Sequence, residues 1–254
     1  MSADQSARAL CKYHQAERAR ARRAHMHDLP LHLWYSITRL GGAGLTLPLA
    51  LTIALWLVLG YSWRLAARWL AIIAAASGIV ALTKIAFLGW GVGVREWDFT
   101  GVSGHAMLST AVYPVGLFLT LLPTRASVRV LGVVLGLAAG VAVGLSRIVL
   151  EAHSPSEALA GCIVGALAAV LFVWWAWDVR PGKLSTVPVA VSLLMLAVAL
   201  HDVRVPTQRW ITHVALHLSG RDRPYIRARW RAGLETPHRA PSASTSAAPR
   251  TNFV

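Results

Sequence analysis

Acidic residues and cysteine are both scarce in this chain of 254 residues. It has 11 Asp+Glu against 25 Lys+Arg, and charged residues amount to 14%, where a soluble domain has roughly 25%. Hydrophobic residues reach 56%. This composition excludes intrinsic disorder for most of the chain and argues against a water-soluble globule. Two cysteines, Cys11 and Cys162, are too few for a disulfide scaffold or a cysteine-rich metal site.

Charge is absent from several long stretches, and most of the basic residues lie before residue 40 or after residue 201. A helix rises about 1.5 Å per residue, so roughly 20 residues cross a hydrocarbon core of about 30 Å. Lipid offers no hydrogen-bond partner to an unpaired backbone, so a spanning segment must be helical. The uncharged stretches predict six membrane helices, near 43–62, 67–88, 105–123, 129–146, 157–177 and 185–201.

We therefore expect an all-α fold, a polytopic membrane helix bundle with about six transmembrane helices, over residues 42–201. The preceding segment, 1–41, is a basic N-terminal tail in which 29–41 could form an interfacial helix. The following segment, 202–254, is a basic and partly disordered C-terminal tail. Neither tail carries a recognisable nucleic-acid-binding motif, so we expect no nucleic-acid partner.

Four glycines fall in pairs at four-residue spacing within two of the predicted helices. They are Gly140 with Gly144, and Gly161 with Gly165. Small residues at this spacing let two helices approach closely, but glycine is also common in membrane helices in general. The pattern leaves close packing and ordinary composition equally open.

Two of the segments that join predicted helices carry polar groups that the composition does not explain. The first contains Lys84, Arg95, Ser103, Gly104 and His105, and the second contains Arg147, His153 and Glu157. With six spans, the loop between the second and third helices emerges on the same face as the loop between the fourth and fifth. We therefore expect these side chains to converge on one pocket at the membrane boundary.

The chemistry of these groups suits a bound phosphate. Uncompensated cations near the ends of hydrophobic helices are costly, so Lys84, Arg95 and Arg147 imply an anionic partner. The helix that begins near residue 105 presents unpaired N–H groups and its dipole to an anion, and Gly104 lets a phosphate approach the backbone. Histidine serves nucleophilic and acid–base steps near neutral pH. The pocket therefore predicts phosphoryl transfer.

The motifs in these two segments resemble those of the type 2 phosphatidic acid phosphatase superfamily, in its membrane-bound branch of lipid phosphate phosphatases. Ser103-Gly104-His105 matches the family's Ser-Gly-His motif. Ser146-Arg147, then five residues, His153, three residues and Glu157 match its third motif, with Glu in place of the family's Asp.

The first motif of the family is matched less completely. Lys84 corresponds to its start, but Gly91-Val92 stands where the family has Arg-Pro, and Arg95 could replace that Arg from a different position. The resemblance covers roughly residues 80–165. Family members usually carry these loops after the third and fifth of six helices, so either 29–41 stands in for a first helix or the span count differs.

The resemblance implies a role for each matched residue. His153 would attack phosphorus and carry a phosphohistidine intermediate, and His105 would protonate the leaving group. Glu157 would hold the imidazole of His153 in the right tautomer. The phosphate would be held by Lys84, Arg147, Ser103, Gly104 and, as a weaker candidate, Arg95. No cofactor and no metal are implied, because side-chain cations can balance the phosphate charge.

Each of these residues also has a purely structural interpretation. Ser154-Pro155-Ser156-Glu157 is a capping box, so Glu157 could simply start a helix, or serve both purposes. Arg147 could be an interfacial arginine, and Lys84 and Arg95 could mark the membrane boundary. A metal site built from the two histidines and a carboxylate fits the residue types but has no supporting motif spacing.

The sequence therefore predicts a membrane phosphatase acting on a lipid phosphate monoester or a lipid diphosphate. The alternatives are a headgroup phosphotransferase and, in different classes, a non-catalytic anion transporter or a catalytically inactive scaffold, since the first motif is irregular. We expect a multi-pass protein of a bacterial inner membrane, with the catalytic face on the periplasmic side. The basic loops at the other end favour this orientation, whereas the basic tails favour the reverse. The oligomeric state is not determined.

Overall fold

The computed structural model describes residues 31–179, 186–200, 203 and 205–234. The described chain is helical and contains no strand apart from one isolated bridge between Val94 and Phe99. In chain order the helices are α2 (Leu31–Leu40), α3 (Ala43–Gly60), α4 (Trp63–Trp90), the 3-10 turn η1 (Arg95–Trp97), α5 (Gly104–Thr120), α6 (Ala126–Val149), α7 (Pro155–Ala176), α8 (Thr186–Leu200), α9 (Thr207–Ser219) and α10 (Arg227–Arg231).

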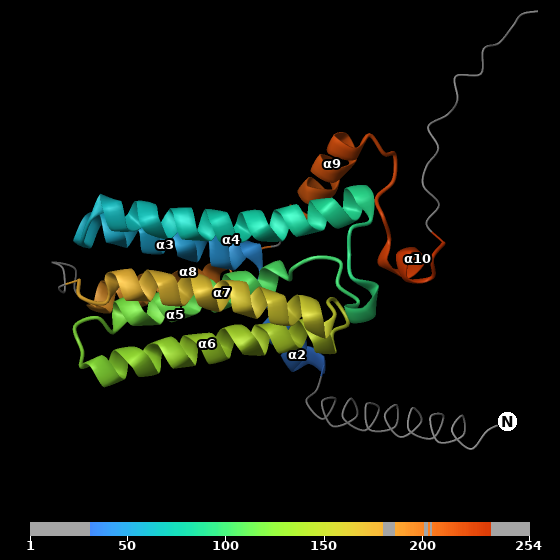
Figure 1. The fold of residues 1–254 in the computed structure, drawn as a ribbon. Helices are drawn as coiled ribbons and strands as arrows, with labels where there is room; N and C mark the ends of the chain where they lie inside the picture. The colour runs from blue at the N-terminus through green and yellow to red at the C-terminus, as the bar shows by residue number, and fades with distance from the viewer. Residues whose placement is uncertain (1–30, 180–185, 201–202, 204, 235–254) are drawn as a thin grey trace, which may run out of the picture.

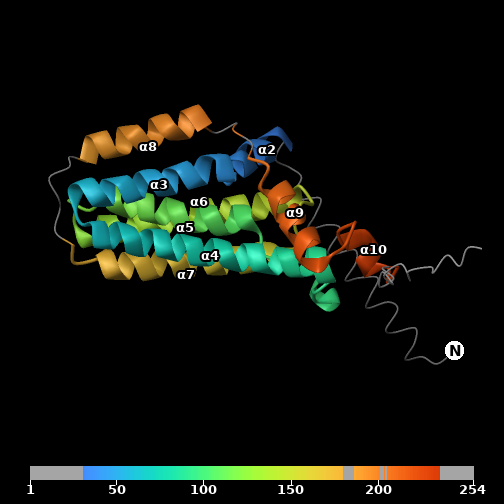
Figure 2. The ribbon, with the colours of Figure 1, turned by 90° about the horizontal axis from the view of Figure 1, so that it is seen from above.

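Helices α3 to α8 run side by side as an elongated bundle (Figures 1 and 2), and each overlaps one of the six predicted segments. Four stretches are long and apolar enough to cross a membrane: Leu31–Gly60, Trp63–Trp90, Ala126–Val149 and Pro155–Ala176. Helices α5 and α8 are shorter, with 17 and 15 residues. The all-α membrane bundle is confirmed, whereas the number of spans, about six, stays a prediction.

A short helix precedes the bundle, inside the segment 29–41 that the sequence marks as amphipathic. This helix, α2, has 10 residues, so it rises only about 15 Å and cannot cross a bilayer alone. A turn at Gly41 and Gly42 separates it from α3, and together the two helices form one apolar stretch of 30 residues. Helix α2 packs against α6.

Helix α5 lies at the centre of the bundle and contacts α3, α4, α6, α7 and α8. The glycines of α6 and α7 bring those helices close to it: a Cβ added at Gly140 would lie 2.5 Å from Thr110 Cα, and one added at Gly161 would lie 2.6 Å from the Ser103 carbonyl oxygen. Helices can approach so closely only where a side chain is missing. The close-packing interpretation of these glycines is therefore confirmed.

The outer surface of the bundle is apolar, as contact with lipid requires. Leucines of several helices are more than half exposed; among them are Leu51, Leu55, Leu59, Leu82, Leu131, Leu135, Leu159 and Leu167. The inside is filled by large side chains, with Trp69 against Phe172 in an edge-on ring contact of 5.1 Å between centroids. The bundle thus presents an apolar outer surface and also has an apolar core.

The C-terminal part returns to the bundle end at which α4 finishes. Helix α9 packs against α4, and α10 lies beyond the end of the bundle, near the segment that contains η1 (Figure 1). Helix α2 lies at the same end of the molecule (Figures 1 and 2). Both described terminal segments therefore lie at the end that carries the predicted site residues.

Candidate active site

The loop from α4 to α5 folds back onto Lys84, which lies near the end of α4. Gly91 ends that helix with a left-handed φ of 72°, and its N–H donates to the Phe87 carbonyl. Further along, Gly101 has a φ of 150°, and a Cβ there would lie 3.0 Å from Lys84 Cγ. The Val102 N–H donates to the Thr83 hydroxyl at 3.1 Å. These contacts place the Ser-Gly-His motif beside Lys84.

Ser103 joins the start of α5 to α7. Its backbone N–H donates to the Glu157 carbonyl oxygen at 3.1 Å, and the residue is fully buried. Its hydroxyl makes no capping bond to α5 and has no hydrogen-bond partner within the described part of the chain. A buried hydroxyl without a partner costs about 1–3 kcal/mol, so this group is suited to accept or donate to a ligand.

Glu157 makes the contacts that both of its interpretations, as a helix cap and as the partner of His153, require. It completes the capping box of α7 with Ser154, and its Oε2 lies 2.7 Å from His153 Nδ1. Its Oε1 accepts the Thr100 N–H at 2.7 Å and the Thr100 hydroxyl at 2.6 Å. The side chain is completely buried, which an ionised carboxylate tolerates only with such a set of donors.

The contact with Glu157 determines which nitrogen of His153 can react. An ionised carboxylate is only an acceptor, so Nδ1 carries the proton and the lone pair of a neutral imidazole lies on Nε2. Burial lowers the pKa of His153 below its ordinary value, and the hydrogen bond to Glu157 opposes this shift without cancelling it. His153 is therefore neutral, and hence nucleophilic, near pH 7.

The other predicted groups gather around the two histidines. Lys84 and Arg147 lie close enough to His105 and His153 for their positive charges to interact with both imidazoles. The two imidazoles also interact electrostatically with each other. The Arg147 guanidinium donates through Nη1 to the Thr38 hydroxyl at 3.0 Å, while its buried Nε has no partner within the described chain. Four different helices and one loop thus supply a single cluster.

Arg95 is the predicted phosphate ligand that the structure places elsewhere. The residue is exposed, and its guanidinium carbon lies 5.3 Å from the ring centroid of Trp230 in α10. It is not among the cations that act on His105 or His153. Arg95 was expected to replace the missing family arginine from a different position, but its side chain stacks on an aromatic ring.

Four side chains at the site were not expected from the sequence: Thr38, Thr100, Gln208 and Arg227. Thr38 and Thr100 contact Arg147 and Glu157 as described, and Lys84 Nζ donates to Gln208 Oε1 at 3.2 Å. Arg227 forms an ion pair with Glu157. Thr100 could have been noticed because it lies three residues before Ser103, the start of the Ser-Gly-His motif, but the other three lie far from either motif.

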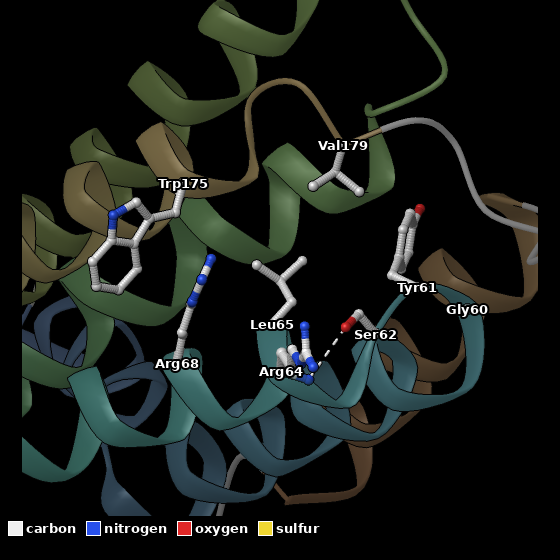
Figure 3. Close-up of a pocket in the computed structure, with 8 residues that line it drawn as sticks. All are labelled: Gly60, Tyr61, Ser62, Arg64, Leu65, Arg68, Trp175 and Val179. Carbon is white, nitrogen blue, oxygen red and sulfur yellow. Dashed lines mark hydrogen bonds between the residues drawn. The ribbon is translucent and has the colours of Figure 1, made fainter.

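The opposite end of the bundle has a cavity of about 360 Å³ (Figure 3). It is lined by Gly60, Tyr61, Ser62, Arg64, Leu65, Arg68, Trp175 and Val179. This described lining contains no histidine and no carboxylate, so it lacks the groups for acid–base or nucleophilic work. The groups suited to phosphoryl transfer therefore lie at the end that carries the histidines.

Comparisons with known proteins agree with this geometry. The PAP2 superfamily profile matches residues 85–181, a region that contains both histidines, Arg147 and Glu157 but begins one residue after Lys84. The chain is 36% identical, over 201 residues, to an uncharacterized 22.5 kDa protein in the cps region of Klebsiella pneumoniae, covering 76% of this chain and 95% of that relative. No solved structure matches. The chain is therefore a membrane-embedded member of the PAP2 superfamily, whose members generally carry phosphatase activity.

Proposed function

We propose that this protein hydrolyses a lipid phosphate monoester or a lipid diphosphate through a phosphohistidine on His153. The proposal depends mainly on one observation: two histidines, two cations and two unpartnered buried donors meet at one end of a bundle of membrane helices. A lipid headgroup lies at that depth, with its acyl chains beside the exposed leucines. The uncharacterized relative carries no assigned substrate, so the lipid class rests on this placement.

Phosphate binding would use the groups that lack partners. The Ser103 hydroxyl and Arg147 Nε are buried donors that phosphate oxygens would satisfy. Lys84 adds a point charge, and the Gly104 N–H lies in the first turn of α5, where an anion is favoured. These groups would neutralise the charge on the equatorial oxygens as the transition state forms. We therefore expect the reaction to proceed in the presence of a chelator. Arg95 is left out because it stacks on Trp230.

The two chemical steps would then use the histidines in turn. In the first step, His153 Nε2 bonds to phosphorus and the bond from phosphorus to the leaving oxygen breaks. His105, which takes up a proton when the anionic phosphate binds beside it, gives that proton to the leaving oxygen. In the second step, neutral His105 takes a proton from water as the water oxygen bonds to phosphorus. The phosphorus–nitrogen bond breaks, its electron pair returns to His153, and inorganic phosphate leaves. Glu157 stabilises the positive imidazole between the steps.

The direct test measures phosphate release from phosphatidate and from a polyprenyl diphosphate by the purified full-length protein, in detergent with a chelator. We expect release by the wild type, loss of about 1,000-fold or more in His153→Ala, and no loss in Arg64→Gln, which lies at the opposite end of the bundle. An acid-labile phosphohistidine should be trapped in the wild type and not in His153→Ala. Full activity of His153→Ala, or no release from any lipid substrate, would overturn the proposal.

A further inference from the structure

The C-terminal segment 205–234, here called the strap, is attached to the end of α4 and to the loop that follows it. The Tyr225 N–H donates to the Leu88 carbonyl at 3.0 Å, and Trp230 Nε1 donates to the Gly91 carbonyl at 2.9 Å. The indole of Trp230 also meets the Phe87 ring edge-on, with 5.5 Å between centroids. These contacts hold the strap against the rim of the active site.

Arg227 extends from the strap to the carboxylate that orients the proposed nucleophile. It forms an ion pair with Glu157 Oε1, and its Nη2 donates to the Thr100 hydroxyl at 2.9 Å. That hydroxyl in turn donates to the same Oε1. Asp98 lies 3.9 Å from Arg227 Nη1 and also binds Arg231, so it keeps the strap arginines at the rim.

Glu157 is therefore shared between a cation and the imidazole. One oxygen faces Arg227, and the other faces His153 Nδ1. A carboxylate whose charge is partly neutralised by a guanidinium attracts a second positive charge less strongly. Without that guanidinium, a protonated His153 would be the nearest charged partner of a fully buried carboxylate, and protonation of the imidazole would be favoured.

We propose that Arg227 is a positioning residue of the active site, which shares Glu157 with His153 and so keeps that imidazole in its neutral, nucleophilic form. This inference rests on the proposed function, because it assigns His153 the nucleophilic step. It adds the C-terminal strap to the catalytic unit, although the strap lies outside the region that the family profile matches.

Burial and the other cations around His153 also favour the neutral imidazole, and Arg227 adds to them through Glu157. Lys84 on α4 and Arg147 on α6 act on the imidazole with positive charge, and His105 on α5 lies within range as well. Among the described residues, Glu157 is the acidic group that acts on His153. Arg227 is the cation that pairs with this carboxylate, so it controls the one influence that favours a protonated imidazole.

The test compares three variants of the full-length protein: Arg227→Gln, Arg227→Lys and Arg229→Gln. Arg229 lies in the same helix, is exposed, and makes no side-chain contact with the site that the structure records, so it is the matched control. The measurement is kcat/KM for the lipid substrate across pH, since its acid limb reports the ionisation of groups in the free enzyme.

In Arg227→Gln we expect the midpoint of the acid limb to rise by about one pH unit. At a pH below that midpoint, kcat/KM should therefore be about 10-fold lower than in the wild type. At a pH well above the limb the rate should stay within a few-fold of the wild type. Arg227→Lys should restore most of the profile, and Arg229→Gln should match the wild type. An unmoved limb, or an equal loss at every pH, would overturn the inference.

A second readout does not depend on turnover. Histidine-labelled protein, with His153 assigned from the His153→Asn spectrum, is titrated by NMR in detergent, and thermal unfolding checks that each variant is folded. We expect the His153 midpoint to rise in Arg227→Gln and to stay in place in Arg229→Gln. If the midpoint rises but the wild type releases no phosphate, the proposed function fails and the coupling to Arg227 stands. If the wild type is active and the midpoint does not move, the coupling fails alone.

Discussion

At the residue scale, one carboxylate links the start of a helix to the orientation of an imidazole. Glu157 is the third residue of α7, where a capping box requires it, and His153 precedes it by four residues, just before the N-cap. The same side chain also accepts a hydrogen bond from Thr100 and forms an ion pair with Arg227, which come from other parts of the chain. A change at this position therefore affects both the helix and the chemistry.

Replacing this carboxylate by its amide separates charge from shape. Glu157→Gln keeps an oxygen for the capping bonds but cannot stabilise a positive imidazole, so we expect kcat to fall about 100- to 10,000-fold. Helix α7 should lose about 1 kcal/mol or more of stability. Steady-state kinetics and thermal unfolding measure the two effects. Glu151→Gln, an exposed position between the two halves of the motif, is the control, and an unchanged kcat in Glu157→Gln would contradict the assignment.

The pH dependence of the wild type follows from the environment of His153. Burial lowers the pKa of this imidazole below its ordinary value of 6.5, so the group stays neutral until the pH falls below that value. Protonation removes the Nε2 lone pair, and activity is therefore lost as the pH decreases. We expect the acid limb of kcat/KM, and of phosphohistidine formation, to lie below pH 6.5. A limb at or above that value would contradict this description.

His105 can be tested through the leaving group that it is proposed to protonate. A general acid contributes about 100- to 10,000-fold when the leaving oxygen is strongly basic. His105→Asn should therefore lower kcat by about that factor on a lipid phosphate, and by much less on p-nitrophenyl phosphate, whose leaving group needs little protonation. Competition between the two substrates measures the difference. An equal loss on both would instead indicate a role in binding.

At the scale of elements, the arrangement of the proposed catalytic residues depends on how closely α5 approaches its neighbours. The Ser-Gly-His motif begins α5, and the His153–Glu157 pair begins α7, so the spacing of these two helices sets the distance between the motifs. Gly161 of α7 faces the Ser103 carbonyl at the start of α5. Any side chain at that glycine must push the two motifs apart.

A pair of glycine-to-alanine substitutions tests this dependence. A Cβ at Gly161 would lie 2.6 Å from the Ser103 carbonyl oxygen, whereas a Cβ at Gly78 of α4 meets nothing within 4 Å. We expect Gly161→Ala to lose about 1–3 kcal/mol of stability and most of its activity. Gly78→Ala should be neutral or stabilised by up to about 1 kcal/mol. Thermal unfolding and phosphate release compare them, and equal behaviour would contradict the packing argument.

At the scale of the whole molecule, the two ends of the bundle differ in charge and in chemistry. The end opposite the histidines carries Arg64 and Arg68 in its cavity wall and Arg125 and Arg129 at the start of α6. Basic residues in short loops are retained in the cytoplasm. The strap and α2 lie at the other end (Figure 2). We propose that the histidine end faces the periplasm.

Reporter proteins test this orientation. A periplasmic phosphatase reporter fused after Val254 should be active, and a fluorescent protein that folds only in the cytoplasm should be dark there. The same reporters inserted after Thr124, in the loop that joins α5 to α6, should give the opposite result. Cytoplasmic fluorescence from the fusion after Val254 would show that the orientation is the reverse of the one proposed. The arrangement of the site would be unaffected by that result.

Much of this protein was predictable from local patterns. The uncharged stretches located α3 to α8, because the energetic cost of charge in lipid acts on each segment independently. The capping box and the His153–Glu157 pair could be predicted from the sequence, because the residues that interact lie only three or four positions apart. The glycine pairs suggested close packing, although not which helices they would face.

The remaining features came from contacts between distant parts of the chain. Arg227 meets Glu157, and Thr38 meets Arg147, across more than 60 residues, and no periodicity relates such positions. Arg95 was expected at the phosphate as a replacement for the missing family arginine from a different position, but its neighbour is Trp230, which the folding of the strap places there. Local energetics act within a few residues and so specify helices and caps, whereas the partners of a side chain depend on which helices pack together.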